Sequence, residues 1–160
     1  MVKQSAGAGA RLSQRKRPAH GVRVSVLRPT IVFVTVCSDG REPWLATPEV
    51  HALLRQVRQE ATAWLVGRYV IMPDHVHLFV APGQPELALE NWVRYRKSQF
   101  TQGHGEPEHR WQAGFWDTRL RTGESYDDKW EYVRGNPVRH RLVEHAEEWP
   151  FQGVIHELAW

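Results

Sequence analysis

The alternation of apolar and polar positions predicts a strand and then a helix in the first third of the chain. The β-branched and aromatic run 31–36 has the composition of a buried strand. Thr47 followed by Pro48 has the form of a helix N-cap with proline in the first turn. Apolar residues then recur at spacings of three and four, which predicts a helix that runs to about Val66 and ends at Gly67.

The following apolar segments predict a β-hairpin and a second helix. Residues 68–71 and 75–81 each have the composition of a strand, and the Met-Pro-Asp sequence at 72–74 between them has the composition of a turn. A helix with an apolar face is then expected over about 86–102.

The last third of the chain predicts one more strand and further helices. We expect a strand near the end of 111–120, a third helix opened by residues 123–125 that runs to about Gly135, and a short helix through Ala146. The Trp-Pro-Phe sequence at 149–151 is expected to pack back onto the core. The resulting order, β-α-β-β-α-β, predicts a ferredoxin-like α+β fold in which helices back an antiparallel sheet.

The composition is that of one globular domain preceded by a basic arm. A chain of 160 residues with 41% hydrophobic content is long enough for one core. Residues 1–20 show no apolar period, so we predict a flexible basic N-terminal arm followed by a single domain over residues 21–160. The single cysteine, Cys37, excludes an internal disulfide. No apolar run approaches the length of a membrane span, and we expect a cytoplasmic protein.

Positive charge is unevenly distributed along this chain of net charge +3. Basic residues gather in the N-terminal segment and again in the last third, and clustered arginines favour contact with phosphates. A solvated surface with a basic tail is the alternative that charge alone leaves open. The candidate phosphate contacts are Arg15, Lys16, Arg17, Arg119, Arg121, Arg134 and Arg139.

Two histidines form the first candidate site for chemistry. His75 and His77 are two residues apart in a predicted strand, so their imidazoles point to the same face. A strand often holds a divalent metal in this way, but two imidazoles do not complete a metal site. A pair of exposed or hydrogen-bonded strand histidines is the alternative interpretation.

A second pair of residues lies in the third predicted helix. Tyr132 and Asn136 are four residues apart and would share a helical face, although Pro137 disfavours helix at Asn136. If that face meets the histidine strand, Asn136 can offer its amide oxygen to the metal and Tyr132 stands beside it as a nucleophile. On its own, however, a helical tyrosine is more often a core or surface residue.

Four segments, taken together, carry a family resemblance. They are the hairpin 69–80, the Phe-Trp-Asp segment at 115–121, the segment from Tyr132 to Arg139, and the Glu-Trp-Pro-Phe sequence at 148–151. In order and spacing they resemble the REP-associated tyrosine transposases, which are single-tyrosine transposases with a histidine–hydrophobe–histidine motif. The resemblance covers about residues 30–153.

The resemblance implies a ferredoxin-like fold that acts on single-stranded DNA near hairpin-forming repeats. It implies that His75 and His77 hold Mg²⁺ or Mn²⁺ and that Asn136 occupies the position of a polar third ligand. Tyr132, on a C-terminal helix, would attack the scissile phosphate and form a 5′-phosphotyrosine link with a free 3′-hydroxyl. The protein would be nucleoid-associated and act as a monomer, with a dimer as the alternative.

The chain departs from the family pattern at two places. Gly135 replaces the apolar residue that usually precedes Asn-Pro, and the N-terminal arm has no family motif. Because 15–17 is the densest basic run of that arm, we predict that it contributes to DNA binding.

Three functions remain open at this point. The first is a DNA strand transferase that uses Tyr132. The second is a metal-dependent hydrolase in which the two histidines activate water and Tyr132 only packs. The third is a non-catalytic binder of structured nucleic acid that has kept the fold.

Overall fold

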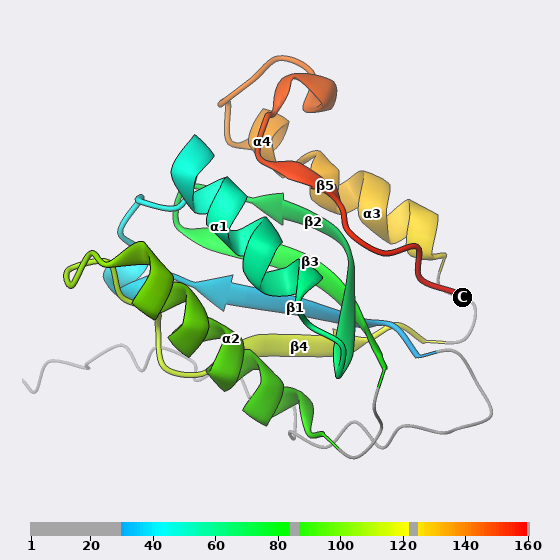
Figure 1. The fold of residues 1–160 in the computed structure, drawn as a ribbon. Coiled ribbons are helices and arrows are strands. Elements are labelled where there is room, and N and C mark those ends of the chain that lie inside the picture. Colours follow the sequence, from blue (N-terminus) through cyan, green and yellow to red (C-terminus); the bar gives the residue numbers. More distant parts are fainter. Residues whose placement is uncertain (1–29, 84–86, 122–124, 160) are drawn as a thin grey trace, which may run out of the picture.

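The computed structural model describes residues 30–83, 87–121 and 125–159 (Figure 1). The N-terminal arm predicted over residues 1–20 therefore lies outside the described part of the chain. The elements are β1 (Val32–Cys37), η1 (Asp39–Arg41), α1 (Pro48–Gln59), β2 (Trp64–Ile71), β3 (His75–Pro82), α2 (Leu89–His104), β4 (Trp116–Arg119), α3 (Tyr126–Arg134), α4 (Asn136–Arg139), η2 (Ala146–Glu148) and β5 (Gln152–Val154).

The strands form one antiparallel sheet in the order β4-β1-β3-β2-β5. The first four strands and the helices α1 and α2 have the βαββαβ order predicted from the sequence, and the α+β fold is confirmed. β5 pairs with the outer side of β2 and was not predicted. Within the described ranges, no helix is long and apolar enough to cross a membrane.

Alternation along the strands gives the sheet two different faces. Val34 and Leu78 belong to the larger core cluster, which α1 and α2 complete by lying side by side over one face (Figure 1). Phe79 and Val70 point to the other face and pack with Tyr126 of α3 in a second cluster. The sheet is therefore a central layer between two separate apolar clusters.

The first helix is shorter than its apolar spacing predicts. α1 has the expected cap, since the Thr47 side chain accepts a hydrogen bond from the Val50 amide, but it ends at Gln59 rather than near Val66. Residues 64–66 belong to β2, where Leu65 pairs with Ala81 of β3. Pairing with a long neighbouring strand outweighs a helical spacing that local sequence favours only weakly.

Gly67, predicted to end that helix, lies instead inside β2 beside a register shift between Val66 and Tyr69. A Cβ at this position would lie 2.6 Å from Leu158 Cδ1 and 2.7 Å from the Tyr126 hydroxyl oxygen. A side chain at this position would have to displace the ends of the Leu158 and Tyr126 side chains, which lie close to the strand backbone here.

Other helix ends also differ from their predicted positions. α2 continues to His104 because Gly105, with φ +70°, provides the left-handed cap, rather than ending near residue 102. α3 has its N-cap at Ser125, the last of the three residues predicted to open this helix, and ends at Arg134, next to the predicted end at about Gly135. The helix predicted through Ala146 consists of the short α4, which begins at Asn136, followed later by η2.

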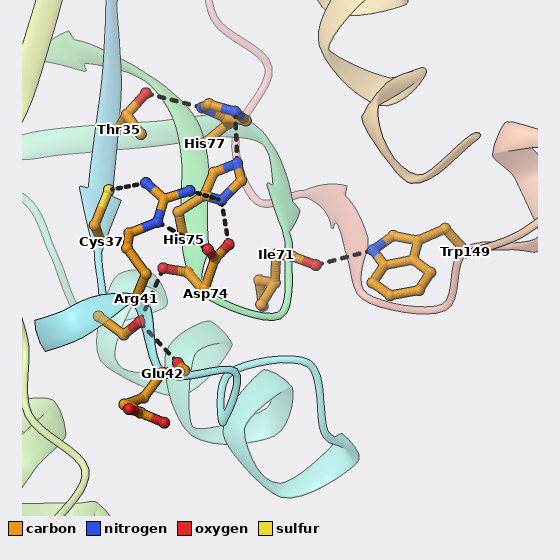
Figure 2. Close-up of polar contacts among 10 residues, drawn as sticks. Thr35, Cys37, Arg41, Glu42, Ile71, Asp74, His75, His77 and Trp149 are labelled. Atoms are coloured by element: carbon orange, nitrogen blue, oxygen red, sulfur yellow. Dashed lines mark hydrogen bonds and ion pairs between the residues drawn. The ribbon is translucent and has the colours of Figure 1, made fainter. Parts of the chain in front are cut away.

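The segment after η2 returns to the sheet, as predicted for residues 149–151. Trp149 is 8% exposed, and its indole N–H donates to the Ile71 carbonyl at 2.9 Å (Figure 2). The Ile71 amide in turn donates to the Phe151 carbonyl at 2.8 Å. These bonds fix the end of β2 immediately before the turn that leads to the two histidines.

We expect Trp149→Ala to reduce the free energy of unfolding by about 3–5 kcal/mol, because it removes a large buried side chain and leaves the Ile71 carbonyl without its donor. Trp149→Phe should cost less, since the ring is partly kept. Chemical denaturation of both variants measures the difference. Equal stability of Trp149→Ala and the wild type would contradict this role of the C-terminal segment.

Candidate active site

The strand β3 places His75 and His77 on the sheet face that α3 covers. Their neighbours Val76 and Leu78 point into the opposite cluster, as strand alternation requires. Both histidines are largely shielded from solvent, and His75 is only 7% exposed. Their Nε2 atoms face each other at 3.1 Å (Figure 2). The structure therefore directs both imidazoles to one point in space.

The outer nitrogen of each imidazole has its own hydrogen-bond partner. Nδ1 of His75 lies 2.7 Å from Oδ1 of Asp74, and Nδ1 of His77 lies 2.8 Å from the hydroxyl oxygen of Thr35 on β1. Phe33, two residues before Thr35, stacks on the His77 ring with centroids 5.2 Å apart. These contacts hold both rings in position and leave the two Nε2 atoms directed at each other.

Arg41 ties the Asp74 carboxylate to the rest of the sheet. Its Nε donates to Oδ2 of Asp74 at 2.8 Å, and a second guanidinium nitrogen donates to Sγ of the buried Cys37 at 3.1 Å (Figure 2). A third lies 3.3 Å from Nδ1 of His75. Burial raises the pKa of Asp74, but the hydrogen bonds from His75 and Arg41 outweigh it and leave this pKa below its ordinary value.

Both histidines are held in the neutral form that a metal needs. Burial lowers the pKa of His77 to about 3, helped by the positive charges of Arg41, Lys129 and Arg139 and by His75. Burial also lowers the pKa of His75, against the opposing effect of Asp74. Neutral imidazoles are the ligands that divalent metals bind.

The geometry of the pair fits a divalent cation. Two ligands at right angles, each about 2.1 Å from an octahedral cation, are separated by roughly 3.0 Å, close to the distance between the two Nε2 atoms. Metal-bound histidines commonly donate their other N–H to a carboxylate or another oxygen, which is the arrangement around Asp74 and Thr35. Among the described residues, no group of three His, Cys, Asp or Glu side chains forms a metal site, so the two histidines alone would provide only part of a coordination sphere.

Tyr132 lies on α3 with 64% of its surface exposed. Lys129, one turn earlier, connects it to the histidine face, because the Lys129 ammonium lies 5.3 Å from the Phe33 ring centroid and 5.9 Å from the Tyr132 ring centroid. Phe33 is the ring that stacks on His77. Tyr132 is thus an accessible phenol on the helix next to the histidine pair. The side chains of Lys129 and Phe33 lie between its ring and His77.

Asn136 is joined to Tyr132 through Arg139. The Arg139 guanidinium lies 4.3 Å from the Tyr132 ring centroid and donates hydrogen bonds to the Tyr132 carbonyl at 2.5 Å and to the Asn136 amide oxygen. The oxygen predicted as the third metal ligand therefore accepts from an arginine in this structure. Coordination by Asn136 remains a prediction, and it requires the Arg139 side chain to release this oxygen.

The predicted phosphate-binding arginines lie in different surroundings. Arg139 is beside Tyr132, whereas Arg134 pairs with Glu131 at 3.2 Å and with Glu147 at 3.4 Å. Arg119 pairs with Val32 in the sheet and therefore points to the face opposite the histidines. Arg121 is exposed just beyond β4. Residues 15–17 lie outside the described part of the chain.

Four residues of this site were missed by the sequence analysis: Thr35, Arg41, Asp74 and Lys129. Asp74 directly precedes His75, and its position offered a signal, although it was interpreted only as part of a turn. Lys129 is three residues before Tyr132, a spacing that places it on the same helical face. Thr35 and Arg41 have no local signal, because Thr35 meets His77 only through the pairing of β1 with β3, and Arg41 meets Asp74 only through the turn that follows β1.

The depressed pKa of His77 predicts acid destabilisation of the metal-free protein. Unfolded histidine takes up a proton below its ordinary pKa of 6.5, whereas the folded His77 does so only near its pKa of about 3. The unfolded state then binds more protons, so stability falls as the pH drops from 6.5 towards 3, by up to about 1.4 kcal/mol per pH unit. Denaturation with chelator present measures this slope, and His77→Gln should flatten it. Equal slopes in the two proteins would contradict the burial of a neutral His77.

Comparison with known proteins gives two curated relatives that are both described as REP-associated tyrosine transposases. The chain is 30% identical over 135 residues to a REP-associated tyrosine transposase of Escherichia coli K12. The match covers 79% of this chain and 78% of the relative. A relative in Haemophilus influenzae, assigned to the same kind of transposase, is 28% identical over 94 residues, which are 51% of this chain and 53% of the relative. No family profile matches the chain.

The fold also matches a solved structure, that of a REP-associated tyrosine transposase bound to a REP hairpin. The two share 24% sequence identity with a TM-score of 0.65, over 82% of this chain and 81% of the other. At this identity the likeness supports the fold, and the five-stranded sheet with its helices is the arrangement that the two have in common.

Proposed function

This chain belongs to the family of REP-associated tyrosine transposases, and on that premise we propose that it is a metal-dependent single-stranded DNA endonuclease and strand transferase that acts beside hairpins. The observation that carries the proposal is the convergence of the two Nε2 atoms of His75 and His77 at 3.1 Å, on the sheet face next to the helix of Tyr132. Membership of this family makes the chain a DNA transposase. The geometry of the histidine pair supports the proposal that it cleaves DNA with a bound metal and Tyr132.

In this proposal His75 and His77 would hold Mg²⁺ or Mn²⁺, and Asn136 would be the third protein ligand if Arg139 released its amide oxygen. Asp74 and Thr35 keep the rings oriented by binding their outer nitrogens. When bound, the metal polarises the scissile phosphate and makes its phosphorus a better target for a nucleophile.

Tyr132 supplies the nucleophile through its phenolic oxygen. A bond forms between that oxygen and phosphorus, and the bond from phosphorus to the 3′ oxygen of the preceding nucleotide breaks. The phenolic proton is lost and the departing 3′ oxygen gains one, so the products are a 5′-phosphotyrosine and a free 3′-hydroxyl. Because a phosphodiester is exchanged for another, the reverse attack rejoins strands without an energy cofactor.

Positive charge near Tyr132 suits a phosphate substrate. Lys129 and Arg139 both lie against its ring, at 5.9 and 4.3 Å from the centroid. Charges held in this position would stabilise the negative charge on the transferring group. The other predicted DNA contacts, Arg119, Arg121, Arg134 and the run 15–17, would act further along the strand.

Hairpin DNA is the proposed partner because the solved relative is bound to a REP hairpin. The proposed form is a monomer in which the histidines and Tyr132 of one chain act together, and light scattering of the free and DNA-bound protein can test this.

The deciding experiment mixes the full-length protein with labelled single-stranded DNA that carries a hairpin and a 3′ extension, with Mn²⁺ or with chelator. A protein–DNA adduct that survives denaturation, forms only with metal and leaves a free 3′-hydroxyl is the expected result. Cleavage without an adduct would favour a hydrolase that activates water. Tight hairpin binding with neither product would favour a non-catalytic binder.

A further inference from the structure

Two imidazole nitrogens that face each other at 3.1 Å require something between their lone pairs. Either one Nε2 carries a proton and donates it to the other, or both bind one cation. A neutral imidazole has a single N–H, so in each ring Nδ1 accepts a hydrogen bond when Nε2 is protonated and donates one when Nε2 is not. The partners of the outer nitrogens therefore decide which arrangements are possible.

Asp74 allows His75 only one tautomer. A carboxylate only accepts hydrogen bonds, so the 2.7 Å contact with Oδ1 places the proton of His75 on Nδ1. The Arg41 nitrogen that lies 3.3 Å from the same Nδ1 is the longer contact and makes no hydrogen bond to it in this tautomer. Arg41 holds the other carboxylate oxygen at 2.8 Å, which keeps Asp74 ionised and in place. Nε2 of His75 is then always an acceptor, whether it faces a proton or a cation.

The proton shared by the two Nε2 atoms must consequently come from His77. With its proton on Nε2, the Nδ1 atom of His77 is an acceptor and needs a donor. When Nε2 binds a cation, the proton of His77 moves to Nδ1, which then needs an acceptor. His77 thus changes tautomer on metal binding, while its net charge stays zero.

Thr35 is the partner that meets both needs. Its hydroxyl oxygen lies 2.8 Å from Nδ1 of His77, and a hydroxyl both donates and accepts by rotation of its proton. Thr35 pairs with His77 across β1 and β3, and a β-branched residue in a strand has few rotamers, so the hydroxyl is held in place. A carboxylate or an ammonium at this position would support only one of the two tautomers.

We propose that Thr35 is a positioning residue whose hydroxyl supports both tautomers of His77, donating to Nδ1 when Nε2 is protonated and accepting from it when Nε2 binds a divalent cation. The inference rests on the proposed metal-dependent function and assigns a role to a residue outside the histidine motif. Thr35 stabilises the metal-bound pair without touching the metal or the DNA.

The test is the affinity of the full-length protein for Mn²⁺, measured by electron paramagnetic resonance without DNA. Thr35→Val keeps the shape and branching but removes the hydroxyl, and it should weaken binding by roughly 10–100-fold. Thr35→Ser keeps the hydroxyl and should bind within a few-fold of the wild type. Thermal denaturation of all three proteins checks that they are folded.

The outcomes separate this inference from the proposed function. If the wild type binds Mn²⁺ and Thr35→Val binds it equally well, the role of Thr35 is overturned while the proposed function stands. Equal weakening in Thr35→Ser and Thr35→Val would also overturn it, because packing rather than the hydroxyl would then matter. A wild type that does not bind Mn²⁺ would contradict the proposed metal dependence itself.

A second measurement needs no variant. Nitrogen-15 NMR of labelled histidine distinguishes the two tautomers of a neutral imidazole. We expect the proton of His77 on Nε2 in metal-free protein and on Nδ1 when Mg²⁺ is bound, with His75 carrying its proton on Nδ1 throughout. A proton on Nδ1 of His77 in both states would overturn the proposal.

Discussion

Tyr132→Phe is expected to abolish the covalent protein–DNA adduct and to reduce strand cleavage by roughly 10³-fold or more, because the variant lacks the oxygen that attacks phosphorus. The change removes one exposed hydroxyl from α3, so the fold and hairpin binding should persist. Denaturing electrophoresis of labelled DNA after reaction with Mn²⁺ measures both the adduct and the cleaved strand.

Tyr95 provides a matched control for this experiment. It is also an exposed tyrosine on a helix, with 57% of its surface accessible, but it lies on α2, which covers the opposite face of the sheet. Tyr95→Phe should therefore form the adduct at the wild-type rate. An adduct that persists in Tyr132→Phe would rule out Tyr132 as the nucleophile, and continued cleavage without an adduct would indicate attack by water.

We expect His77→Ala to reduce DNA cleavage about as strongly as Tyr132→Phe, because it weakens the proposed metal site. One of the two converging nitrogens is lost, so we expect Mn²⁺ affinity to fall by about 100-fold or more and metal-dependent cleavage to fall with it. Binding of the hairpin in chelator should remain, because it depends on basic side chains rather than on the histidines. Titration of Mn²⁺ into the variant, followed by affinity and by cleavage, measures the two effects together.

The control for His77 is the exposed His145, which precedes η2 and lies outside the cluster around Asp74 and Thr35. His145→Ala should bind Mn²⁺ and cleave DNA as the wild type does. Wild-type cleavage by His77→Ala at low Mn²⁺ would show that the histidine pair does not hold the catalytic metal.

The hydrogen-bond partners of the two imidazoles determine which tautomer each ring can adopt. In the proposed site, Asp74 would fix the tautomer of His75, whereas the hydroxyl of Thr35 would let His77 change tautomer, so the pair would take up a cation without a change in its own net charge. A change of tautomer that keeps the imidazole neutral suits this buried position, because burial strongly disfavours a charged imidazole. The pKa of about 3 for His77 indicates how strongly.

The sequence by itself determined those features that depend on neighbouring residues. The shared direction of His75 and His77 follows from strand alternation, the hairpin follows from the turn at 72–74, and the start of α3 follows from the Ser125 cap. Each needs only a few consecutive residues, and the βαββαβ order is the sum of such local signals. The resemblance to a family, which the relatives confirm, also depends on short motifs in a fixed order.

Only the tertiary structure decided what surrounds these motifs. Pairing of β1 with β3 brought Thr35 to His77, and the turn after β1 brought Arg41 to Asp74, although these partners lie 42 and 33 residues apart in the chain. The end of α1 and the existence of β5 were likewise decided by pairing along β2. The free energy of such contacts comes from groups that meet only after the sheet has formed, and a local pattern therefore specifies the two histidines of this site but not the residues that orient them.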